Sequence, residues 1–178
     1  LGQALQTVNP ANASVGTSQL VDGAVTSAKL ASGAVANTPA FEAYLGSDQT
    51  VTSGTTTKIT MNTETFDSAG AYDNSSNYRF TPQTAGKYYV YATVRGSTSN
   101  SGLEIQMAAI YKNGSTYIEN QIDFRNNNAS LMGATVVAIV DMNGSSDYLE
   151  CYGRCLGGTT IKASPTRSSI FGAYKIIE

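Results

Sequence analysis

The sequence predicts an all-β sandwich that follows a short N-terminal segment. From about residue 40 onward, short apolar stretches alternate with clusters of Gly, Asn, Asp and Ser, a pattern typical of strands and turns. All 11 Tyr and 5 Phe residues lie beyond position 40. No amphipathic helix of three turns appears in the 178 residues. Together these observations favour packed antiparallel sheets.

Residues 1–38 differ in character, and we expect them to form a stalk or linker before a domain at 39–178. They lack aromatic residues, and two ten-residue repeats occupy 18–37, where SQLVDGAVTS aligns with AKLASGAVAN. Two short copies cannot bury a core within one chain. We therefore expect the apolar repeat residues to meet their symmetry mates around a three-fold axis. These residues are Leu20, Val25, Leu30 and Val35.

The predicted strands follow one another at short intervals. In chain order they are residues 40–45, 57–61, 78–82, 87–95, two strands within 103–124, then 129–142, 147–156 and 168–177. Each is rich in β-branched or aromatic residues and is bounded by turn-forming residues. Within 103–124, Lys112-Asn113-Gly114-Ser115 predicts a hairpin turn, because Asn-Gly readily adopts the positive φ angles that such a turn requires.

Two of these strands indicate how the sheets are used. In 147–156, amphipathic side chains suited to a subunit interface alternate with small and aliphatic ones suited to a core. The first set is Tyr148, Glu150, Tyr152 and Arg154, and the second is Leu149, Cys151, Gly153 and Cys155. In 87–95 both faces are apolar, with Tyr89, Tyr91 and Thr93 opposite Tyr88, Val90, Ala92 and Val94. We expect something besides the sandwich core to cover one of these faces.

Several motifs occur in an order that resembles the C1q-like domain of the C1q and tumour necrosis factor superfamily. They are PAFEAYL, ITMNTETFDSAGAYDNSSNYRFTPQTAGKYYVYATV, IYKNGS, GSSDYLECYG and SSIFGAYKII, and the resemblance covers about residues 39–177. It implies a jelly roll of about ten strands, a tight homotrimer and both termini at one end. The positions that match the family's framework are Tyr72, Phe80, Gly86, Tyr88, Asn113, Gly114, Asp147, Phe171 and Gly172. We expect Tyr88, Tyr148, Tyr152 and Phe171 to serve as trimer-interface or framework residues.

The N-terminal repeat carries a second resemblance. LVDGAVTSAKLASGAV resembles the Gly-Ala-Val-Thr-x-Ala-Lys-Leu repeats in the shafts of bacteriophage tail and head fibres. No collagenous Gly-X-Y stalk of the kind found in animal members of the superfamily is present. The pairing implies a fibre or spike on the exterior of a virion, with the stalk joined to other virion proteins.

Composition excludes several classes of function. The net charge of -2 gives no general attraction for nucleic acid or an anionic membrane, and no apolar run approaches the ~20 residues that span a bilayer. The N-terminus shows no basic-then-apolar signal pattern. The absence of histidine removes Ser-His and Cys-His nucleophile pairs and the common zinc sites. We expect no cofactor and no catalytic activity.

The two cysteines are expected to be buried free thiols. On one straight strand, the Cα atoms of Cys151 and Cys155 would lie ~13 Å apart, beyond the ~7 Å that a disulfide permits. A bend at Gly153 would still allow a bridge.

Carboxylates suggest two further kinds of site. Aspartates beside turns are weak candidates for calcium ligands, although Asp at turns is expected anyway. They are Asp67, Asp73, Asp123, Asp141 and Asp147. A glycoside hydrolase needs two carboxylates ~5–9.5 Å apart, and nothing in the spacing pairs any of the glutamates. The glutamates of suitable type are Glu42, Glu64, Glu104, Glu119 and Glu150.

Three polar loops are candidates for receptor binding, because exposed Tyr, Asn, Asp and Ser suit shallow carbohydrate recognition. They are 95–102, 125–130 and 157–167, with Arg95, Asn100, Arg125, Asn127 and Arg167 as the candidate contacts. The resulting hypothesis is a non-enzymatic trimeric fibre or spike that attaches to a host-surface glycan, lipopolysaccharide or protein. The alternatives are a head-fibre or capsid decoration protein without receptor binding and, third, a surface-polysaccharide hydrolase.

Overall fold

The computed structural model describes residues 18, 20–26, 29, 37–163 and 167–176. The chain forms two compact units, residues 1–36 and 37–178, and the second contains every strand described below. In the first unit the described residues include a turn at Gly23, across which the Ala24 N–H donates to the Val21 carbonyl oxygen over 2.9 Å. No helix among the described residues has the length and apolar character needed to cross a membrane.

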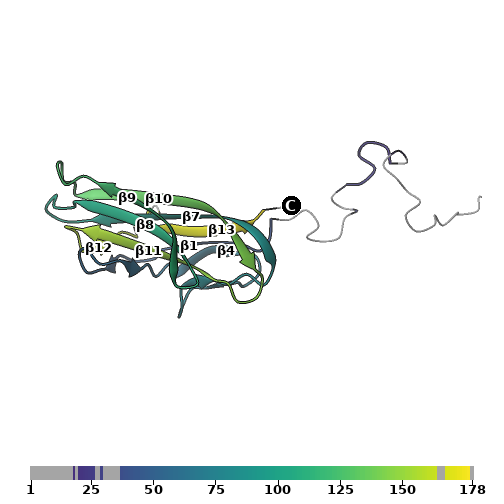
Figure 1. Cartoon of the computed structure of the whole chain (residues 1–178), viewed down its shortest axis with the longest axis horizontal. Helices are drawn as coiled ribbons and strands as arrows, with labels where there is room; N and C mark the ends of the chain where they lie inside the picture. Colours follow the sequence, from purple (N-terminus) through teal and green to yellow (C-terminus); the bar gives the residue numbers. More distant parts are fainter. Residues whose placement is uncertain (1–17, 19, 27–28, 30–36, 164–166, 177–178) are drawn as a thin grey trace, which may run out of the picture. The chain divides into compact units, whose positions relative to one another are not determined.

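The second unit is an antiparallel β-sandwich. Its longer strands are β1 (Ala40–Tyr44), β4 (Thr63–Asp67), β7 (Ala85–Ser97), β8 (Ile105–Lys112), β9 (Ser115–Asp123), β10 (Leu131–Asn143), β11 (Leu149–Leu156) and β13 (Ile170–Lys175). Strands of two residues are β2 (Gln49–Thr50), β3 (Thr57–Lys58), β5 (Tyr72–Asp73), β6 (Arg79–Phe80) and β12 (Thr160–Ile161). The longer strands run along the sandwich in Figure 1, where β13 (yellow) lies between β7 and β1.

The strands form two sheets of jelly-roll type. Sheet A has the order β2-β12-β7-β13-β1-β4, with β10 paired to the other edge of β7. Sheet B has the order β5-β6-β11-β8-β9, with β3 paired to β11. Many neighbours in space are far apart in sequence, as β1 and β13 show. This arrangement confirms the predicted fold class.

The sandwich has two distinct ends. At the terminal end, the Lys175 N–H donates to the Pro39 carbonyl oxygen over 3.1 Å, so both ends of the described sandwich chain emerge together. The turns at 113–114 and 143–147 lie at this same end, joined by the bond from the Asn143 N–H to Asp147 Oδ2 and by the contacts of Asn113 with Asp147. The distal end holds the loops after β7, β9 and β11, where Leu131 and Thr160 both pair with Ser97.

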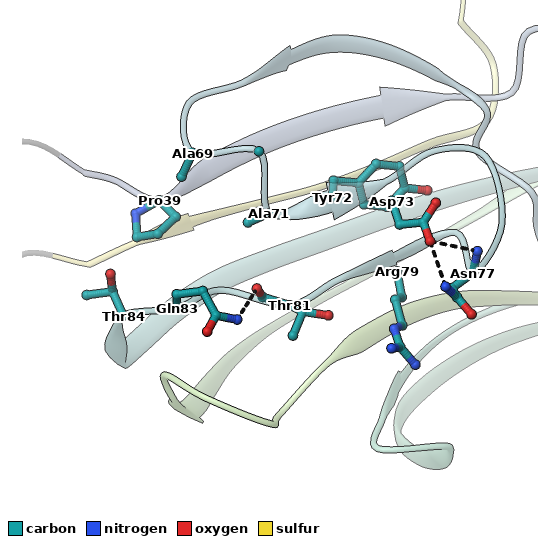
Figure 2. Close-up of a pocket in the computed structure, with 11 residues that line it drawn as sticks. Pro39, Ala69, Ala71, Tyr72, Asp73, Asn77, Arg79, Thr81, Gln83 and Thr84 are labelled. Atoms are coloured by element: carbon teal, nitrogen blue, oxygen red, sulfur yellow. Dashed lines mark hydrogen bonds between the residues drawn. The ribbon is translucent and has the colours of Figure 1, made fainter.

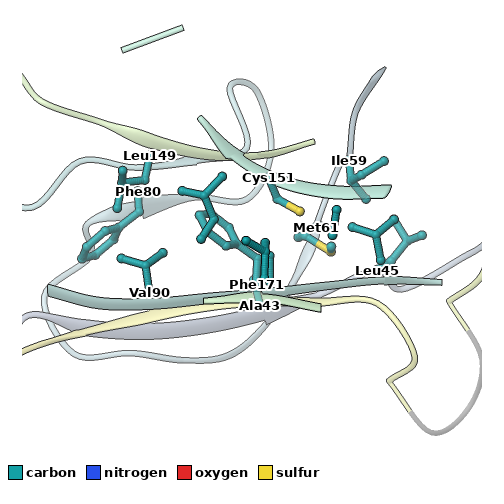
Figure 3. Close-up of a cluster of buried hydrophobic side chains, with 14 of the residues drawn as sticks. Ala43, Leu45, Ile59, Met61, Phe80, Val90, Leu149, Cys151 and Phe171 are labelled. Atoms are coloured by element: carbon teal, nitrogen blue, oxygen red, sulfur yellow. The ribbon is translucent and has the colours of Figure 1, made fainter. Parts of the chain in front are cut away.

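The core fills the space between the sheets (Figure 3). Phe41 is at its centre, with ring centroids 4.6 Å from Tyr72, 4.4 Å from Phe80 and 5.1 Å from Phe171. Tyr72 is buried with its hydroxyl donating to the Met61 carbonyl oxygen over 2.9 Å, and burial raises the pKa of its phenol. Burial of these rings is the main stabilising contribution, because large apolar areas leave water.

The observed strands differ from the predicted ones mainly where only two residues of a predicted strand pair with a neighbour. The run expected at 57–61 is a strand only at Thr57–Lys58, and the one expected at 78–82 only at Arg79–Phe80. The strand at Thr63–Asp67 was not expected, because its polar residues show no apolar alternation. It forms because it pairs along β1, with Phe41 opposite Asp67 and Tyr44 opposite Thr63. The hairpin turn at Asn113-Gly114 is confirmed, with φ angles of 53° and 78°.

Candidate assembly and attachment surfaces

The outer side of sheet A carries exposed and half-buried aromatic and aliphatic side chains, which we call the aromatic face. It consists of Phe66, Tyr89, Tyr91, Val137, Ile139 and Tyr174. Val137 and Ile139 are each 47% exposed, and Phe66 is 48% exposed. The register places Ile139 opposite Tyr89, and Tyr89 opposite Tyr174, whose ring centroid is 5.3 Å from that of Tyr89. An apolar patch of this kind is typical of an interaction surface.

Gly172 shapes the middle of the aromatic face. It is opposite Tyr91 in the register, and a Cβ atom placed on it would lie 2.4 Å from the Tyr91 ring. The Tyr91 ring therefore fills the space that any larger residue at position 172 would need. This contact explains physically why a glycine interrupts the apolar pattern of the last strand.

One carboxylate lies within the aromatic face. The Tyr91 hydroxyl donates to Glu42 Oε2 over 2.7 Å, and Arg167 Nη1 lies 3.9 Å from Glu42 Oε1. Burial raises the pKa of Tyr91, and the hydrogen bond to Glu42 raises it further. The Arg167 guanidinium also covers the Tyr44 ring, 4.9 Å from its centroid. Glu42 is thus held by a phenol and a cation rather than left unpaired on an apolar surface.

The predicted interface residues of β11 lie on the outer side of sheet B. Tyr152 stacks on Tyr111 with centroids 3.9 Å apart, and the Arg79 guanidinium lies 4.6 Å from the centroid of the Tyr148 ring. Glu150, from the same face, is buried and accepts from Lys58 Nζ over 2.5 Å. The two-residue alternation expected for this strand is present, because Leu149, Cys151 and Cys155 point into the core.

Two other expected interface or framework residues belong to the core of a single chain. Tyr88 and Phe171 are fully buried. The Tyr88 hydroxyl donates to the Thr84 carbonyl oxygen over 2.8 Å, and burial raises its pKa to about 12. Their side chains point between the sheets, so within a single chain both are core residues.

The stalk residues are only partly described. Leu20 and Val25 are exposed within the chain, and Leu30 and Val35 lie outside the described residues.

The aspartates named as calcium candidates differ in their contacts. Asp67 accepts from the Ala69 and Tyr72 N–H groups, and Asp73 accepts from the backbone of 75–77. Asp141 is exposed and lies 3.4 Å from Lys87 Nζ, whereas Asp147 binds Asn113 and Lys112. In the part of the chain that is described, no three His, Cys, Asp or Glu residues gather as a metal site would require.

The loop candidates lie at the distal end, but several of their side chains are engaged within the chain. Arg95 Nη1 donates to Ser168 Oγ over 2.8 Å, and Arg125 Nε donates to Asp123 Oδ1 over 3.0 Å. Asn100 Oδ1 accepts from the Thr98 hydroxyl over 2.7 Å, whereas at Asn127 it is the backbone N–H that bonds, donating to the Phe124 carbonyl oxygen over 2.8 Å. The loops at 98–102 and 126–130 lie together, since Thr98 binds Ser130 and Leu103 binds Ala129.

The cysteines are free and buried, and the glutamates lie in both sheets. Burial raises the pKa of Cys151 strongly and that of Cys155 to about 11, so both thiols are protonated at neutral pH. Glu42 and Glu64 lie on β1 and β4 of sheet A, whereas Glu119 and Glu150 lie on β9 and β11 of sheet B. Glu104 precedes β8.

Sequence reasoning missed three elements of these surfaces: the contribution of β10, the position of Phe66 and the environment of Arg79. Residues 134–140 are apolar at almost every position, so the pattern could not show that Val137 and Ile139 point outward. Phe66 is the one aromatic residue of a polar strand, and this isolated position is the only sequence feature that could have indicated an apolar surface there.

Comparisons with known proteins support the fold. The globular domain of zebrafish complement 1qA protein aligns with a TM-score of 0.57 and 11% identity, covering 79% of this chain and 98% of that one. Eiger TNF from S. frugiperda aligns with a TM-score of 0.57 and 12% identity over 78% and 91% of the two chains. Murine APRIL aligns with a TM-score of 0.58 and 9% identity over 77% and 98%. At these identities the similarity shows a C1q/TNF-like fold and nothing further.

The comparison of the sequence with protein-family models finds no matching family, and the comparison with curated protein sequences finds no matching protein.

Proposed function

We propose that this chain is a non-enzymatic, homotrimeric fibre or spike protein on the exterior of a bacteriophage, whose sandwich domain attaches to the host surface. The observation that carries the proposal is the placement of the polar loops. Residues 98–102 and 126–130 lie together at the distal end, whereas the chain enters the sandwich at Pro39, at the terminal end. The point at which the chain enters the sandwich is thus at the end opposite these loops, as an adhesive tip requires.

The N-terminal repeat supports the virion setting. Its resemblance to fibre-shaft repeats is independent of the sandwich, and its apolar residues are exposed where they are described. A three-chain shaft would give Leu20 and Val25 symmetry mates to pack against. The proposed partners are therefore two further copies of the chain, other virion proteins at the stalk, and a host glycan, lipopolysaccharide or protein receptor.

The aromatic face supports self-association. Val137 and Ile139 are each 47% exposed, so a second copy that covers them removes apolar surface from water. Each would contribute about half of the roughly 1.5–3 kcal/mol that full burial of an aliphatic side chain is worth. Three shallow sites on one rigid trimer, and many trimers on a particle, give tight attachment without a deep pocket. Such multivalent binding suits loops whose individual contacts with a receptor are weak.

The proposal is tested by binding of the purified full chain to a panel of bacterial strains and to lipopolysaccharide extracted from them. We expect binding to at least one strain, and we expect the double variant Asn100→Ala/Asn127→Ala to lose roughly tenfold or more in apparent affinity, because a small loss per site is multiplied over three copies. Ser76→Ala, in an exposed loop that is not at the distal end, is the matched control and should bind normally.

A head-fibre or decoration protein without receptor binding is the second candidate. The engagement of Arg95 with Ser168 and of Arg125 with Asp123 favours it, because these cations are already used within the chain. Immunogold labelling of particles separates the two proposals, since attachment requires an exposed position at a tail or spike tip. Normal infection by particles that lack residues 39–178 would support decoration and contradict attachment.

The proposal of a non-enzymatic protein has its own test. Release of reducing sugar from host polysaccharide by the wild-type chain, abolished by a single Glu→Gln substitution, would contradict it and establish a hydrolase.

A further inference from the structure

A polar pocket opens beside β5 and β6, far from the distal loops. It holds about 400 Å³ of water-accessible space, which is within the roughly 300–1,000 Å³ range of small-molecule sites. Figure 2 shows Arg79 and Asn77 at one end of the pocket and Pro39 and Thr84 at the other. The trough between them is bordered by the hydroxyl of Thr81 and the amide of Gln83.

The rim of this pocket is fixed by Asp73. Its carboxylate accepts from the N–H groups of Ser75, Ser76 and Asn77 over 3.0, 2.9 and 3.0 Å, and from Asn77 Nδ2 over 2.7 Å. These bonds, the backbone ones first, hold the pKa of Asp73 far below its ordinary value. The carboxylate is therefore ionised and its oxygens are bound by its own loop, so it lines the pocket without forming an ion pair with Arg79.

That cation is Arg79, which lies between two carboxylate residues in the sheet. The register places it opposite Asp73 on one side and Glu150 on the other, but Glu150 binds Lys58 Nζ over 2.5 Å. Among the described residues, no carboxylate oxygen forms an ion pair with Arg79. Its guanidinium is oriented by the Tyr148 ring, 4.6 Å away at the centroid. Stacking uses the flat face of a guanidinium and leaves the donors at its edge available to a planar anion.

We propose that this pocket binds an acidic sugar, with the carboxylate of a hexuronic acid on the Arg79 edge. Carboxylates match the fork of a guanidinium in geometry and charge. The hydroxyl groups of Thr81 and Thr84 provide donors and acceptors for ring hydroxyl groups along the trough. Gln83 provides its Oε1 as an acceptor, because its Nε2 donates to the Thr81 carbonyl oxygen over 3.2 Å. The wall that carries Pro39, Ala69 and Ala71 is apolar and suits the C–H face of a sugar ring (Figure 2). This site does not depend on the proposed attachment role, since it lies outside the distal loops.

The test is an NMR titration of the 15N-labelled full chain with D-glucuronate and, in parallel, with D-glucose. We expect glucuronate to shift the amide signals of Asp73, Arg79 and Thr81 with a Kd of about 1 mM, as suits a small polar site. Glucose should bind roughly tenfold more weakly or worse, because it lacks the charge-assisted hydrogen bonds. Arg79→Gln should reduce glucuronate binding to the level of glucose, whereas Lys29→Gln, which removes an exposed cation of the first unit, should leave it unchanged.

Several results would overturn the proposal: no shifts at these amides, equal binding of glucose and glucuronate, or glucuronate binding unaffected by Arg79→Gln. Inorganic phosphate serves as a third probe, and equal shifts with phosphate alone would show a general anion site in place of a sugar site. If Arg79→Gln does not fold, Thr84→Val at the opposite end of the trough must weaken glucuronate binding for the proposal to stand.

Discussion

At the scale of single residues, short polar side chains hold the turns of this protein. Asp147 is the clearest case, because Asn113 Nδ2 donates to its Oδ1 over 2.8 Å and the Asn143 N–H donates to its Oδ2 over 3.0 Å. Lys112 Nζ lies 2.9 Å from the same Oδ2. One carboxylate thereby joins the two Asn-Gly turns of the terminal end. The hydrogen bond from Asn113, followed by that from Lys112, lowers the pKa of Asp147.

We predict that replacing this carboxylate lowers stability by an amount that depends on pH. Asp147→Asn should lower the free energy of unfolding by about 1–2 kcal/mol at pH 7, as hydrogen bonds to a charged group do. Because the pKa in the folded state lies below the unfolded value of roughly 3.9, the contribution is complete well above pH 4 and is lost as pH falls through the folded pKa. The difference in the free energy of unfolding between wild type and variant, measured in urea melts, should therefore become smaller as the pH is lowered from 6 to 3.

The control for this prediction is Asp141→Asn. Asp141 is exposed and its contact with Lys87 is 3.4 Å long, so the expected change is within about 0.5 kcal/mol. If the loss of unfolding free energy caused by Asp147→Asn is the same at every pH in this range, the charge of the carboxylate does not contribute to stability.

At the scale of elements, the sandwich depends on close approach between strands and on a protected edge. Strand β10 is the edge of sheet A beyond β7, and three of its outward carbonyl oxygens accept hydrogen bonds from side chains of sheet B. The donors are Asn120 Nδ2 to Thr135, Tyr117 Oη to Ile139 and Lys112 Nζ to Asp141, over 2.8, 3.0 and 2.6 Å. These bonds tie the sheets together along one side and block strand addition at this edge.

The packing around two glycines predicts that substitution by alanine has opposite effects on stability at the two positions. A Cβ atom at Gly153 would lie 2.7 Å from Val94 Cγ1 and 3.2 Å from Ile59 Cδ1, so Gly153→Ala should cost about 1–3 kcal/mol of unfolding free energy through overpacking. At Gly133, on β10, a Cβ atom would meet nothing within 4 Å, and Gly133→Ala should be neutral or stabilise by up to about 1 kcal/mol. Thermal melts that rank the two variants in the reverse order would contradict this account of the inter-sheet spacing.

At the scale of the whole molecule, the question is what covers the aromatic face. Sheet A is apolar on both sides at its centre, where Val90 and Ala92 are fully buried inside while Tyr89 and Tyr91 lie outside. A single sandwich has no second layer to cover the outer side. Our proposal assigns that role to other copies of the chain.

Assembly is checked by light scattering of the full chain at micromolar concentration. We expect the mass of three chains, so a monomer would contradict the proposal. Ile139→Lys should raise the concentration at which the trimer dissociates by roughly tenfold or more, because it buries an unpaired charge in the interface. Ser76→Lys adds the same charge in an exposed loop and should leave the mass unchanged.

Local sequence patterns predicted the strands whose signals are local. The alternation in β11 correctly separated Leu149 and Cys151 from Glu150 and Tyr152, and Asn113-Gly114 correctly located a turn. The patterns failed where a strand exists only because of its partner, as in Thr63–Asp67, or where both faces are apolar, as around Val137 and Ile139. The pocket at Arg79 could not be predicted from the sequence either. Arg79 has no ion pair with Asp73 or Glu150 because Asp73 binds its own loop and Glu150 binds Lys58, and only the fold shows these contacts.

The sequence by itself determined that this protein is an all-β sandwich, because the two-residue period of a strand and the φ preferences of turn residues act within a few positions of the chain. Only the tertiary structure decided which apolar faces are core and which are surface. It placed Tyr88 and Phe171 inside, left Tyr89 and Tyr174 outside, and brought loops some thirty to sixty residues apart to one end. Those outcomes depend on hydrogen-bonded pairing between distant strands, such as β1 with β13, and no local pattern encodes that pairing.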